Sequence, residues 1–430
     1  MFQLIKNKIK ELFKIFEVSY FKFISKANQN KILKNIKLKK KINVYFIVSE
    51  KEKWSYETLY NYLRKSNRFI PKIIIFPNNN KNLTLNDSLK RNLNYFKNKN
   101  IIKGIDNKNE IIQPNKILRD YSIIFYDQPV PQIGNQWLPK KIIKKNLLCY
   151  VPYGVKIANS LGEKSHFGLD LHHYCWKIFC ETSWHKKKFI SFVKDKSKVV
   201  NTGHPKLDNL RIKKNLNYKK NFLQKFNKKI IWAPHWTINH YLGSNYSTFD
   251  KNFDYFLDLK KRYKDTYWFF RPHQRLERQI IDTKFMSIDK QVKYFKEWSS
   301  SNSEYYKDIN YFKIFLSSDC MITDCGSFLF EYLFTEKPVL FLESKKSNGW
   351  NELGQKIYNV YYRATNNKQI DKFINDVIYK KKDYLYKKRK NLINQLLKLY
   401  PETKENLDIN KKFISGKRIF DHINEKLKNE

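Results

Sequence analysis

The chain has 430 residues, which is enough for two or three domains, each with its own buried core. Lys and Arg number 85 and Asp and Glu number 40, and the net charge of +45 favours anionic partners such as lipid headgroups and phosphate polymers. No nucleic-acid partner is expected, because the basic residues are spread along the chain with abundant Asn and Ile and form no nucleic-acid-binding motif.

The cysteines and the apolar runs argue against further classes of protein. Five cysteines without CxxC or Cys/His zinc spacing are typical of reduced thiols in the cytoplasm. No acidic cluster has the spacing of metal ligands, so we expect neither a bound metal nor a cofactor. No apolar run approaches the roughly 20 residues that span a bilayer, and the N-terminus lacks the apolar core of a signal peptide.

Residues 1–40 predict a basic amphipathic helix. Lysines alternate there with apolar residues, and one helical face collects Leu4 or Ile5, Ile9, Leu12, Phe13 and Phe16. A helix with aromatic residues on its apolar face and lysines beside it suits an anionic membrane surface. We therefore expect a cytoplasmic protein that binds peripherally to the inner face of the cell membrane. The alternative is that the same apolar face packs on the N-terminal domain.

Residues 41–210 alternate short apolar runs with helical stretches such as 54–64. Strands are expected at 42–48, 72–77, 121–127, 147–153 and 177–185. Near-continuous apolar strands are typical of a parallel sheet that helices cover on both faces. The pattern predicts a Rossmann-like N-terminal domain, and the polar run at 211–229 predicts a helical linker after it.

Two turns of this domain contain candidate site residues. Tyr153 and Gly154 follow an expected strand in CYVPYGVKIAN. His204 lies in NTGHPKLDNL, where a glycine and a proline predict a turn. Ligands of open α/β sheets bind at the carboxyl ends of the strands, so the second turn is expected to border a ligand. The first turn is singled out by the family resemblance given below. For the second turn, the alternative is a hinge between domains that contacts no ligand.

Residues 230–370 predict a second Rossmann-like domain. Its first strand runs into Pro234 and His235 in IIWAPHWT, and a later strand precedes Arg271 and His273 in TYWFFRPHQRL. We expect His273 at the carboxyl edge of the sheet, with Arg271 beside it as a phosphate ligand. A protonated or hydrogen-bond-donating imidazole there would stabilise negative charge on a departing group. The alternative is a surface histidine on a basic loop.

The most specific segment is DCMITDCGSFLFEYLFTEKPVLFLE at 319–343, which predicts a strand, a tight turn, a helix and a second strand. The strand ends at Thr323, Gly326 allows the turn, and Ser327 begins the helix. We expect these three residues to border a phosphate, because a helix N-terminus presents unpaired N–H groups. Glu331 lies one helical turn further on, where it would accept hydrogen bonds from a ribose. The alternative is that the turn only connects a buried strand to a packing helix and that Glu331 is exposed to solvent.

Four of these motifs lie in order between about residues 120 and 345 and resemble the CDP-glycerol glycerophosphotransferase family, whose members build teichoic-acid and some capsular polymers. TDCGSFLFEYLFTEKPVLFL is similar to the phosphate turn and ribose helix of that family. The resemblance implies that Gly326 and Ser327 bind donor phosphate and that Glu331 binds donor ribose. RPHQRL is similar to a PHP motif of the family, which implies that His273 handles the donor pyrophosphate.

Several positions depart from the family pattern. Tyr153 stands where the family has a histidine that is thought to be the base on the acceptor hydroxyl. Its unperturbed pKa near 10 would make it a poor base. Thr237 replaces an arginine of the family's APTWR segment and His235 a threonine, so another cation must bind phosphate. Further candidates for the base are His166, His172 and His173.

The resemblance implies a GT-B fold, in which two Rossmann-like domains face a cleft and helices within 371–430 cross back to the first domain. It also implies transfer of a polyol phosphate, such as glycerol phosphate, from a CDP-activated donor to a hydroxyl of a membrane-linked glycan or polymer, in the synthesis of cell-surface polysaccharide. One alternative is a GT-B glycosyltransferase that uses a nucleotide sugar. Another is a non-catalytic module that binds an anionic polymer or nucleic acid.

Overall fold

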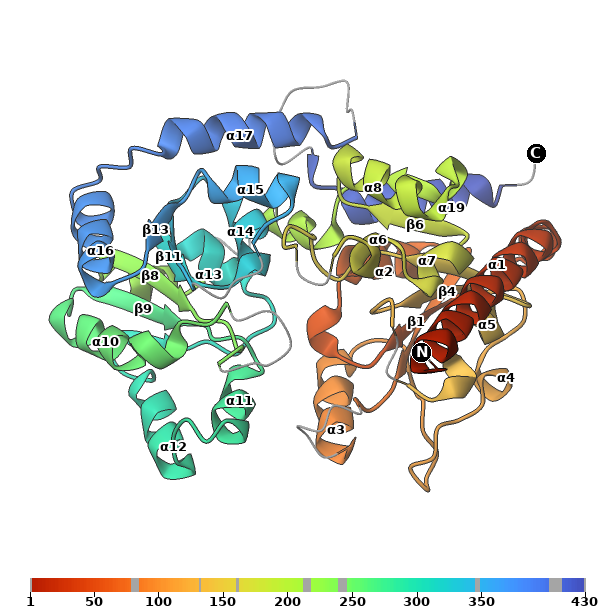
Figure 1. Ribbon diagram of the computed structural model, residues 1–430, viewed down its shortest axis with the longest axis horizontal. Coiled ribbons are helices and arrows are strands. Elements are labelled where there is room, and N and C mark those ends of the chain that lie inside the picture. The colour runs from red at the N-terminus through yellow and green to blue at the C-terminus, as the bar shows by residue number, and fades with distance from the viewer. Residues whose placement is uncertain are drawn as a thin grey trace.

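The structure is a computed structural model that describes residues 2–78, 85–130, 133–159, 162–211, 218–238, 246–344, 349–401 and 412–428. Two α/β domains lie side by side, and helix α17 (Tyr386–Lys398) runs along one edge of the C-terminal domain toward the N-terminal one (Figure 1). Each domain has its own parallel sheet with helices on both faces, which confirms the predicted fold class.

The N-terminal sheet has seven strands in the order β3-β2-β1-β4-β5-β6-β7, and its strand pairs are all parallel. Its strands are β1 (Ile42–Val48), β2 (Phe69–Ile75), β3 (Ile101–Lys103), β4 (Ile123–Tyr126), β5 (Leu147–Tyr150), β6 (Lys177–Cys180) and β7 (Val199–Asn201). Its helices are α2 (Glu57–Lys65), α3 (Leu85–Phe96), α4 (Pro114–Ile117), α5 (Pro139–Ile142), α6 (Lys164–Phe167), α7 (Asp170–Tyr174) and α8 (Ser183–Val193). The sequence did not predict β3 and β7 because three residues are too few to show a period.

The C-terminal sheet has six parallel strands in the order β10-β9-β8-β11-β12-β13. Its strands are β8 (Lys228–Ala233), β9 (Thr266–Phe270), β10 (Ser303–Tyr305), β11 (Cys320–Thr323), β12 (Val339–Leu342) and β13 (Tyr362–Ala364). Its helices are α9 (Lys220–Leu223), α10 (Phe249–Arg262), α11 (Leu276–Asp282), α12 (Ile288–Glu297), α13 (Phe312–Ser317), α14 (Gly326–Leu333), α15 (Glu352–Tyr358) and α16 (Asn367–Lys372), and a π-helix (Phe373–Tyr379) follows. Within the expected linker, residues 212–217 lie outside the described part of the chain.

Both sheets reverse their strand order beside the first strand, between β1 and β4 and between β8 and β11. Such a switch point leaves a crevice at the carboxyl ends of the strands, because the connections leave in opposite directions. In the C-terminal sheet, His235 follows β8 and Gly326 follows β11, at the switch point itself. Tyr153 follows β5 and His273 follows β9, and each of these strands neighbours a switch-point strand.

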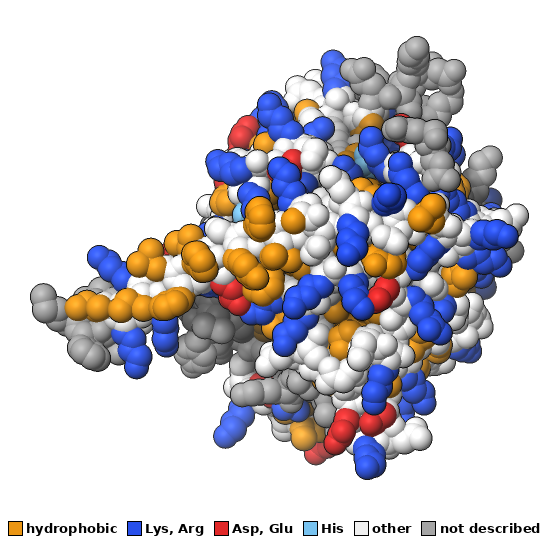
Figure 2. Space-filling view, turned by 90° about the vertical axis from the view of Figure 1, so that its right-hand side faces the viewer, with side chains coloured by type: hydrophobic (Ala, Val, Ile, Leu, Met, Phe, Trp, Pro, Cys, Tyr) orange, Lys and Arg blue, Asp and Glu red, His pale blue; other side chains and the backbone are white. Residues whose placement is uncertain are grey.

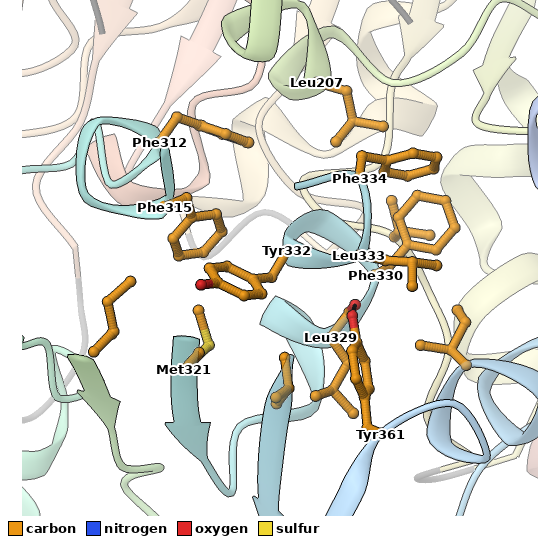
Figure 3. Packing of buried hydrophobic residues seen from close by; sticks show 14 of the residues in the cluster. Leu207, Phe312, Phe315, Met321, Leu329, Phe330, Tyr332, Leu333, Phe334 and Tyr361 are labelled. Carbon is orange, nitrogen blue, oxygen red and sulfur yellow. Dashed lines mark hydrogen bonds between the residues drawn. The ribbon is translucent and has the colours of Figure 1, made fainter. Parts of the chain in front are cut away.

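The core around α14 joins the two domains. Leu329, Phe330 and Leu333 of this helix are buried, and residues of the N-terminal domain such as Leu207 belong to the same cluster. Figure 3 shows Leu207 beside Phe334 at the end of α14. The Tyr361 hydroxyl also donates a hydrogen bond to the Leu329 carbonyl at 2.9 Å. Helix α14 is therefore held firmly at its far end while its first turn faces the cavity described below.

Helix α1 (Phe2–Lys37) has a packed half and an exposed half. Its second half packs on the N-terminal domain, where Ile32 and Ile36 are buried and the Ser25 hydroxyl donates to the Tyr174 carbonyl at 2.7 Å. Its first half projects from the body with a row of apolar side chains (Figure 2). The exposed apolar residues of this row, called here the α1 stripe, are Ile5, Ile9, Leu12, Phe13, Phe16, Tyr20 and Phe23. The side chain of Leu4 lies outside the described residues.

The α1 stripe and the packed face lie on opposite sides of the helix, as the 100° step per residue requires. Because both faces carry apolar residues, α1 is not amphipathic along its whole length. Among the described residues, no helix is both long enough and apolar enough to cross a membrane.

The C-terminal region returns to the N-terminal domain as several separate helices. The helical stretch ends near Lys381, which has a left-handed backbone conformation (φ 58°), and α17 begins at Tyr386. At the end of α17 the Leu399 carbonyl accepts a hydrogen bond from the Ser183 amide. Helix α19 (Ser415–Lys426) then packs on α2.

Candidate active site

A cavity of about 780 Å³ lies between the two domains. Strand ends of both sheets border it: Tyr153 and Gly154 follow β5, Arg271 and His273 follow β9, and Gly326 follows β11. Ser327, Glu331 and His235 complete the set of predicted site residues that line it. The structure therefore brings together most of the residues that the sequence singled out, from segments as far apart as 153 and 331.

The turn after β11 is held by its buried polar residues. Asp324 is fully buried and accepts hydrogen bonds from the His235 amide (2.5 Å), the Thr248 amide (2.6 Å) and the Thr248 hydroxyl (2.9 Å). Burial raises the pKa of Asp324 to about 6, although these hydrogen bonds oppose the shift. Thr323 is also fully buried, donates to the Ala233 carbonyl at 2.6 Å and does not line the cavity. Its side chain joins β11 to β8, so the structure corrects its predicted contact with phosphate.

Gly326 and Ser327 form the first turn of α14, where N–H groups have no partner within the helix. The need for glycine differs from the one predicted, because Gly326 does not have a positive φ. A Cβ at Gly326 would instead lie 2.8 Å from the Trp350 ring. Glycine is required there because the indole packs directly on the turn.

Glu331 is 3 % exposed and lines the cavity, so the alternative of a solvated helix residue is wrong. The Tyr311 hydroxyl donates to its carboxylate at 2.5 Å. Burial raises the pKa of Glu331, and the Lys206 ammonium opposes that shift. The carboxylate is thus oriented by one hydrogen bond and retains acceptor capacity toward the cavity.

His273 is oriented by two backbone contacts. Its amide donates to the Pro234 carbonyl at 2.9 Å, and its Nδ1 accepts from the Arg275 amide at 3.2 Å. Because Nδ1 is an acceptor, the neutral ring carries its proton on Nε2. Burial, then His235 and the neighbouring arginines, hold the pKa of His273 well below its ordinary value. The side chain is therefore a neutral hydrogen-bond donor. Pro234 contributes its carbonyl to this arrangement and does not line the cavity.

Thr237, which stands in place of the family's arginine, has a structural role. It is 2 % exposed, and its hydroxyl accepts from the Tyr246 amide at 3.0 Å and contacts His235 Nδ1 at 2.9 Å. Positive charge comes from five other residues, of which the sequence had assigned only Arg271 to the site. The cations that line the cavity are Lys53, Lys156, Lys206, Arg271 and Arg275.

Tyr153 lies between two of these lysines. The Lys156 ammonium is 4.0 Å from the centre of its ring, and the Lys53 ammonium is 5.6 Å away. Lys156 lowers the pKa of Tyr153 to about 8, although burial acts in the opposite direction. A phenol with this pKa is a competent base near neutral pH, unlike the unperturbed tyrosine considered from the sequence.

His204 is a second correction. It is fully buried, its Nε2–H donates to the Pro152 carbonyl at 2.8 Å, and its Nδ1 accepts from the Lys206 amide at 3.2 Å. Burial lowers its pKa to about 3, so it stays neutral. His204 does not line the cavity. It ties the loop of Tyr153 to the loop of Lys206, and thus positions two residues that do. Among the other histidine candidates, His166 lines the cavity and His172 is fully buried beside Tyr150.

A loop of the C-terminal domain helps to hold Lys156. The Asn351 amide donates to the Ile157 carbonyl at 3.0 Å, and its side chain donates to the Lys156 carbonyl at 2.9 Å. Gly354 is required beside this contact, because a Cβ would lie 2.0 Å from the Ile157 carbonyl oxygen. The Tyr153–Lys156 pair therefore depends on both domains.

Two parallel sheets, with candidate residues at the carboxyl ends of strands in both, define a GT-B-type fold. Residues 158–348 match the model of the CDP-glycerol:poly(glycerophosphate) glycerophosphotransferase family. This match confirms the resemblance seen in the motifs and indicates a CDP-glycerol glycerophosphotransferase-like transferase. No curated protein matches the sequence.

Solved structures with the same fold have low sequence identity to the chain. The wall teichoic acid polymerase TagF is 14% identical, with a TM-score of 0.58 over 99% of this chain and 97% of that one. MnaA of S. aureus with UDP is 15% identical, with a TM-score of 0.56 over 90% of this chain and 97% of that one. UDP-GlcNAc 2-epimerase of Neisseria meningitidis, bound to UDP-GlcNAc, is 15% identical, with a TM-score of 0.53 over 90% of this chain and 99% of that one. At these identities the likeness concerns the fold.

Proposed function

We propose that the protein transfers glycerol phosphate from CDP-glycerol to a hydroxyl of a membrane-linked glycan or polymer, in teichoic-acid-like synthesis of a cell-surface polysaccharide. One observation carries the proposal. The cavity between the domains combines a phosphate turn at Gly326 and Ser327, the neutral imidazole of His273 and the Tyr153–Lys156 pair. The family match and a TagF structure soaked with CDPG favour the CDP-linked donor.

The donor would bind to the C-terminal domain. The N–H groups of Gly326 and Ser327 would receive its phosphates, and Arg271 would add positive charge beside them. Glu331, one helical turn along α14, would accept hydrogen bonds from the ribose. Lys206, close enough to Glu331 to oppose the shift of its pKa, replaces part of the charge that the family's missing arginine would supply.

The reaction needs a base on the acceptor side and a donor of hydrogen bonds on the leaving side. The Tyr153 phenolate would take the proton of the acceptor hydroxyl. At the same time the acceptor oxygen would form a bond to the phosphorus that carries glycerol. The bond from that phosphorus to the bridging oxygen breaks, and CMP leaves with the electron pair. His273 Nε2–H would donate to the developing charge. The products are a new phosphodiester, CMP and a neutral tyrosine. Loss of the tyrosine proton to water restores the phenolate.

The acceptor would be presented at a membrane surface. The α1 stripe is exposed and flanked by Lys6 and Lys8, and the same half of the helix also contains Lys10 and Lys14 (Figure 2). Such a stripe would insert at the level of lipid headgroups while the lysines attract anionic lipids. The protein would then act on the inner face of the cell membrane.

The test is to incubate the purified protein with CDP-glycerol, CDP-ribitol and a panel of nucleotide sugars, and to identify the released nucleotide. CMP release from CDP-glycerol, dependent on added acceptor, is expected. Turnover of a nucleotide sugar, with release of that donor's own nucleotide, would support a GT-B glycosyltransferase instead. Binding of a donor without release of any nucleotide would indicate that the protein is a non-catalytic module.

A further inference from the structure

A second cavity, of about 670 Å³, lies between the domains beside the active-site cavity. Its walls are α3 and the segment after β1 on one side, and α11 and α12 on the other. The two cavities share Glu50, Glu52, Gln274 and Arg275, so they adjoin. At this junction the Arg275 guanidinium lies 3.7 Å from the Glu50 carboxylate. A chain lying in the second cavity would therefore reach the reacting centre past Arg275.

The second cavity is cationic. Six lysine and arginine side chains line it, against three glutamates. All three glutamates are already paired: Glu50 with Lys53 at 2.7 Å and with Arg275 at 3.7 Å, Glu52 with Arg91 at 3.1 Å, and Glu277 with Lys307 at 3.3 Å. Arg275 and Arg278 lie three residues apart at the start of α11, on the same side of the helix, and Lys296 faces the cavity from α12. The surplus charge would attract an anionic ligand.

An apolar wall accompanies these cations. Ile281 of α11 and Ile288, Val292 and Phe295 of α12 line the same cavity. Ile288 and Val292 are 62% and 61% exposed, and one helical turn separates them. Exposed aliphatic residues beside cations suit a ligand that alternates short carbon units with anions. A free nucleotide or inorganic phosphate would leave this apolar wall uncovered.

We propose that this second cavity is a groove for the acceptor, and that it binds a stretch of phosphodiesters separated by short carbon units, as in a glycerol phosphate polymer. The inference rests on the proposed function, because it places the growing chain behind the hydroxyl that Tyr153 deprotonates. The donor-binding residues at α14 line the other cavity, so the donor does not compete for this groove.

The test compares acceptors of one and six glycerol phosphate units. The groove variant is Arg278→Gln with Lys296→Gln, which removes two cations that line the groove but not the active-site cavity. The control is Lys261→Gln with Lys293→Gln, which removes the same charge from exposed positions that line neither cavity. The matched charge matters because a net charge of +45 attracts any polyanion.

Wild type and control should have a lower KM for the six-unit than for the one-unit acceptor. In the groove variant, the KM for the six-unit acceptor should rise roughly fivefold to tenfold, as expected for two partly exposed charge contacts. The KM for the one-unit acceptor and for CDP-glycerol should not change. Equal KM values for the six-unit acceptor in the groove variant and the control would overturn the proposal. An equal rise in KM for both acceptors in the groove variant would overturn it too.

Equilibrium binding separates this inference from the proposed function. If the wild type transfers nothing from CDP-glycerol, calorimetric titration with the six-unit oligomer still decides the question. Weaker binding by the groove variant than by the control would uphold the groove and reject the activity. Equal binding by wild type, groove variant and control would overturn the groove.

Discussion

Tyr153 occupies the wall of the active-site cavity between two lysines, and this position changes the chemistry of its phenol. Because Lys156 lowers the pKa of Tyr153 to about 8, the fraction of phenolate increases through neutral pH. We expect kcat/KM to rise about tenfold per unit below pH 8 and to level off above it. Tyr153→Phe should abolish this rise and lower kcat by roughly a hundredfold. A pH–rate profile of both proteins is the measurement.

The control for this prediction is Lys156→Met, which keeps the phenol and removes the nearer ammonium. The pKa of Tyr153 should then rise, and the rate profile should move upward by about one pH unit. Donor affinity should remain close to the wild-type value in Tyr153→Phe. An unchanged profile in Tyr153→Phe would exclude the phenol as the base.

His273 contributes a neutral N–H rather than a positive charge. Its pKa lies well below the ordinary value, so the imidazole should not titrate in the range where Tyr153 does. His273→Ala should lower turnover by about a hundredfold, which is typical for the loss of one preorganised donor. His273→Gln should recover part of the rate, because an amide can donate one hydrogen bond without charge. Single-turnover kinetics and donor binding should be measured together; wild-type turnover in His273→Ala would remove the assignment.

At the scale of one element, helix α1 serves two environments. Leu12, Phe13 and Phe16 are 65%, 72% and 73% exposed, so replacing them with serine should leave the thermal unfolding midpoint almost unchanged. Sedimentation with anionic liposomes should fall by about tenfold or more, since these side chains would supply most of the buried apolar area.

Two further measurements accompany this prediction. Replacing Lys8, Lys10 and Lys14 with glutamine should weaken liposome binding mainly at low salt, because salt screens exposed charges. Deleting the whole helix is a poor test, since it would remove Ile32 and Ile36 from the core of the N-terminal domain. Sedimentation of the serine variant at the wild-type level would show that the α1 stripe does not bind the membrane.

At the scale of the whole molecule, Asp208 fastens the returning C-terminal helix. Its buried carboxylate accepts hydrogen bonds from the Ser415 amide (2.8 Å), the Gly416 amide (2.9 Å) and the Thr58 hydroxyl (2.8 Å). In Asp208→Asn, an amide nitrogen would face one of these donors, at a cost of about 1–3 kcal/mol. Hydrogen exchange in α19 should increase first. Asp421→Asn, which removes an exposed ion pair with Lys417, should change exchange little, and equal effects of the two substitutions would refute this role.

Patterns of contiguous residues were enough to predict the parallel sheets and several site positions of this protein. The apolar runs that became β1 and β4 predicted the parallel sheet, since burial on both faces requires apolar side chains at nearly every position. The segment 319–343 predicted the β11–α14–β12 unit, and a proline after a strand placed His273 at a sheet edge. These features depend on spacing along the chain, which can be read directly.

Only the tertiary structure decided which of these groups are placed to take part in chemistry. Tyr153 becomes a candidate base because Lys53 and Lys156 lie beside it, and Lys53 is distant in sequence. Glu331 is oriented by Tyr311, whereas Thr323 and His204 are turned into structural roles by their backbone partners. The physical reason is that a pKa and a hydrogen-bond partner depend on burial and on neighbours from other segments, and folding alone brings those neighbours together.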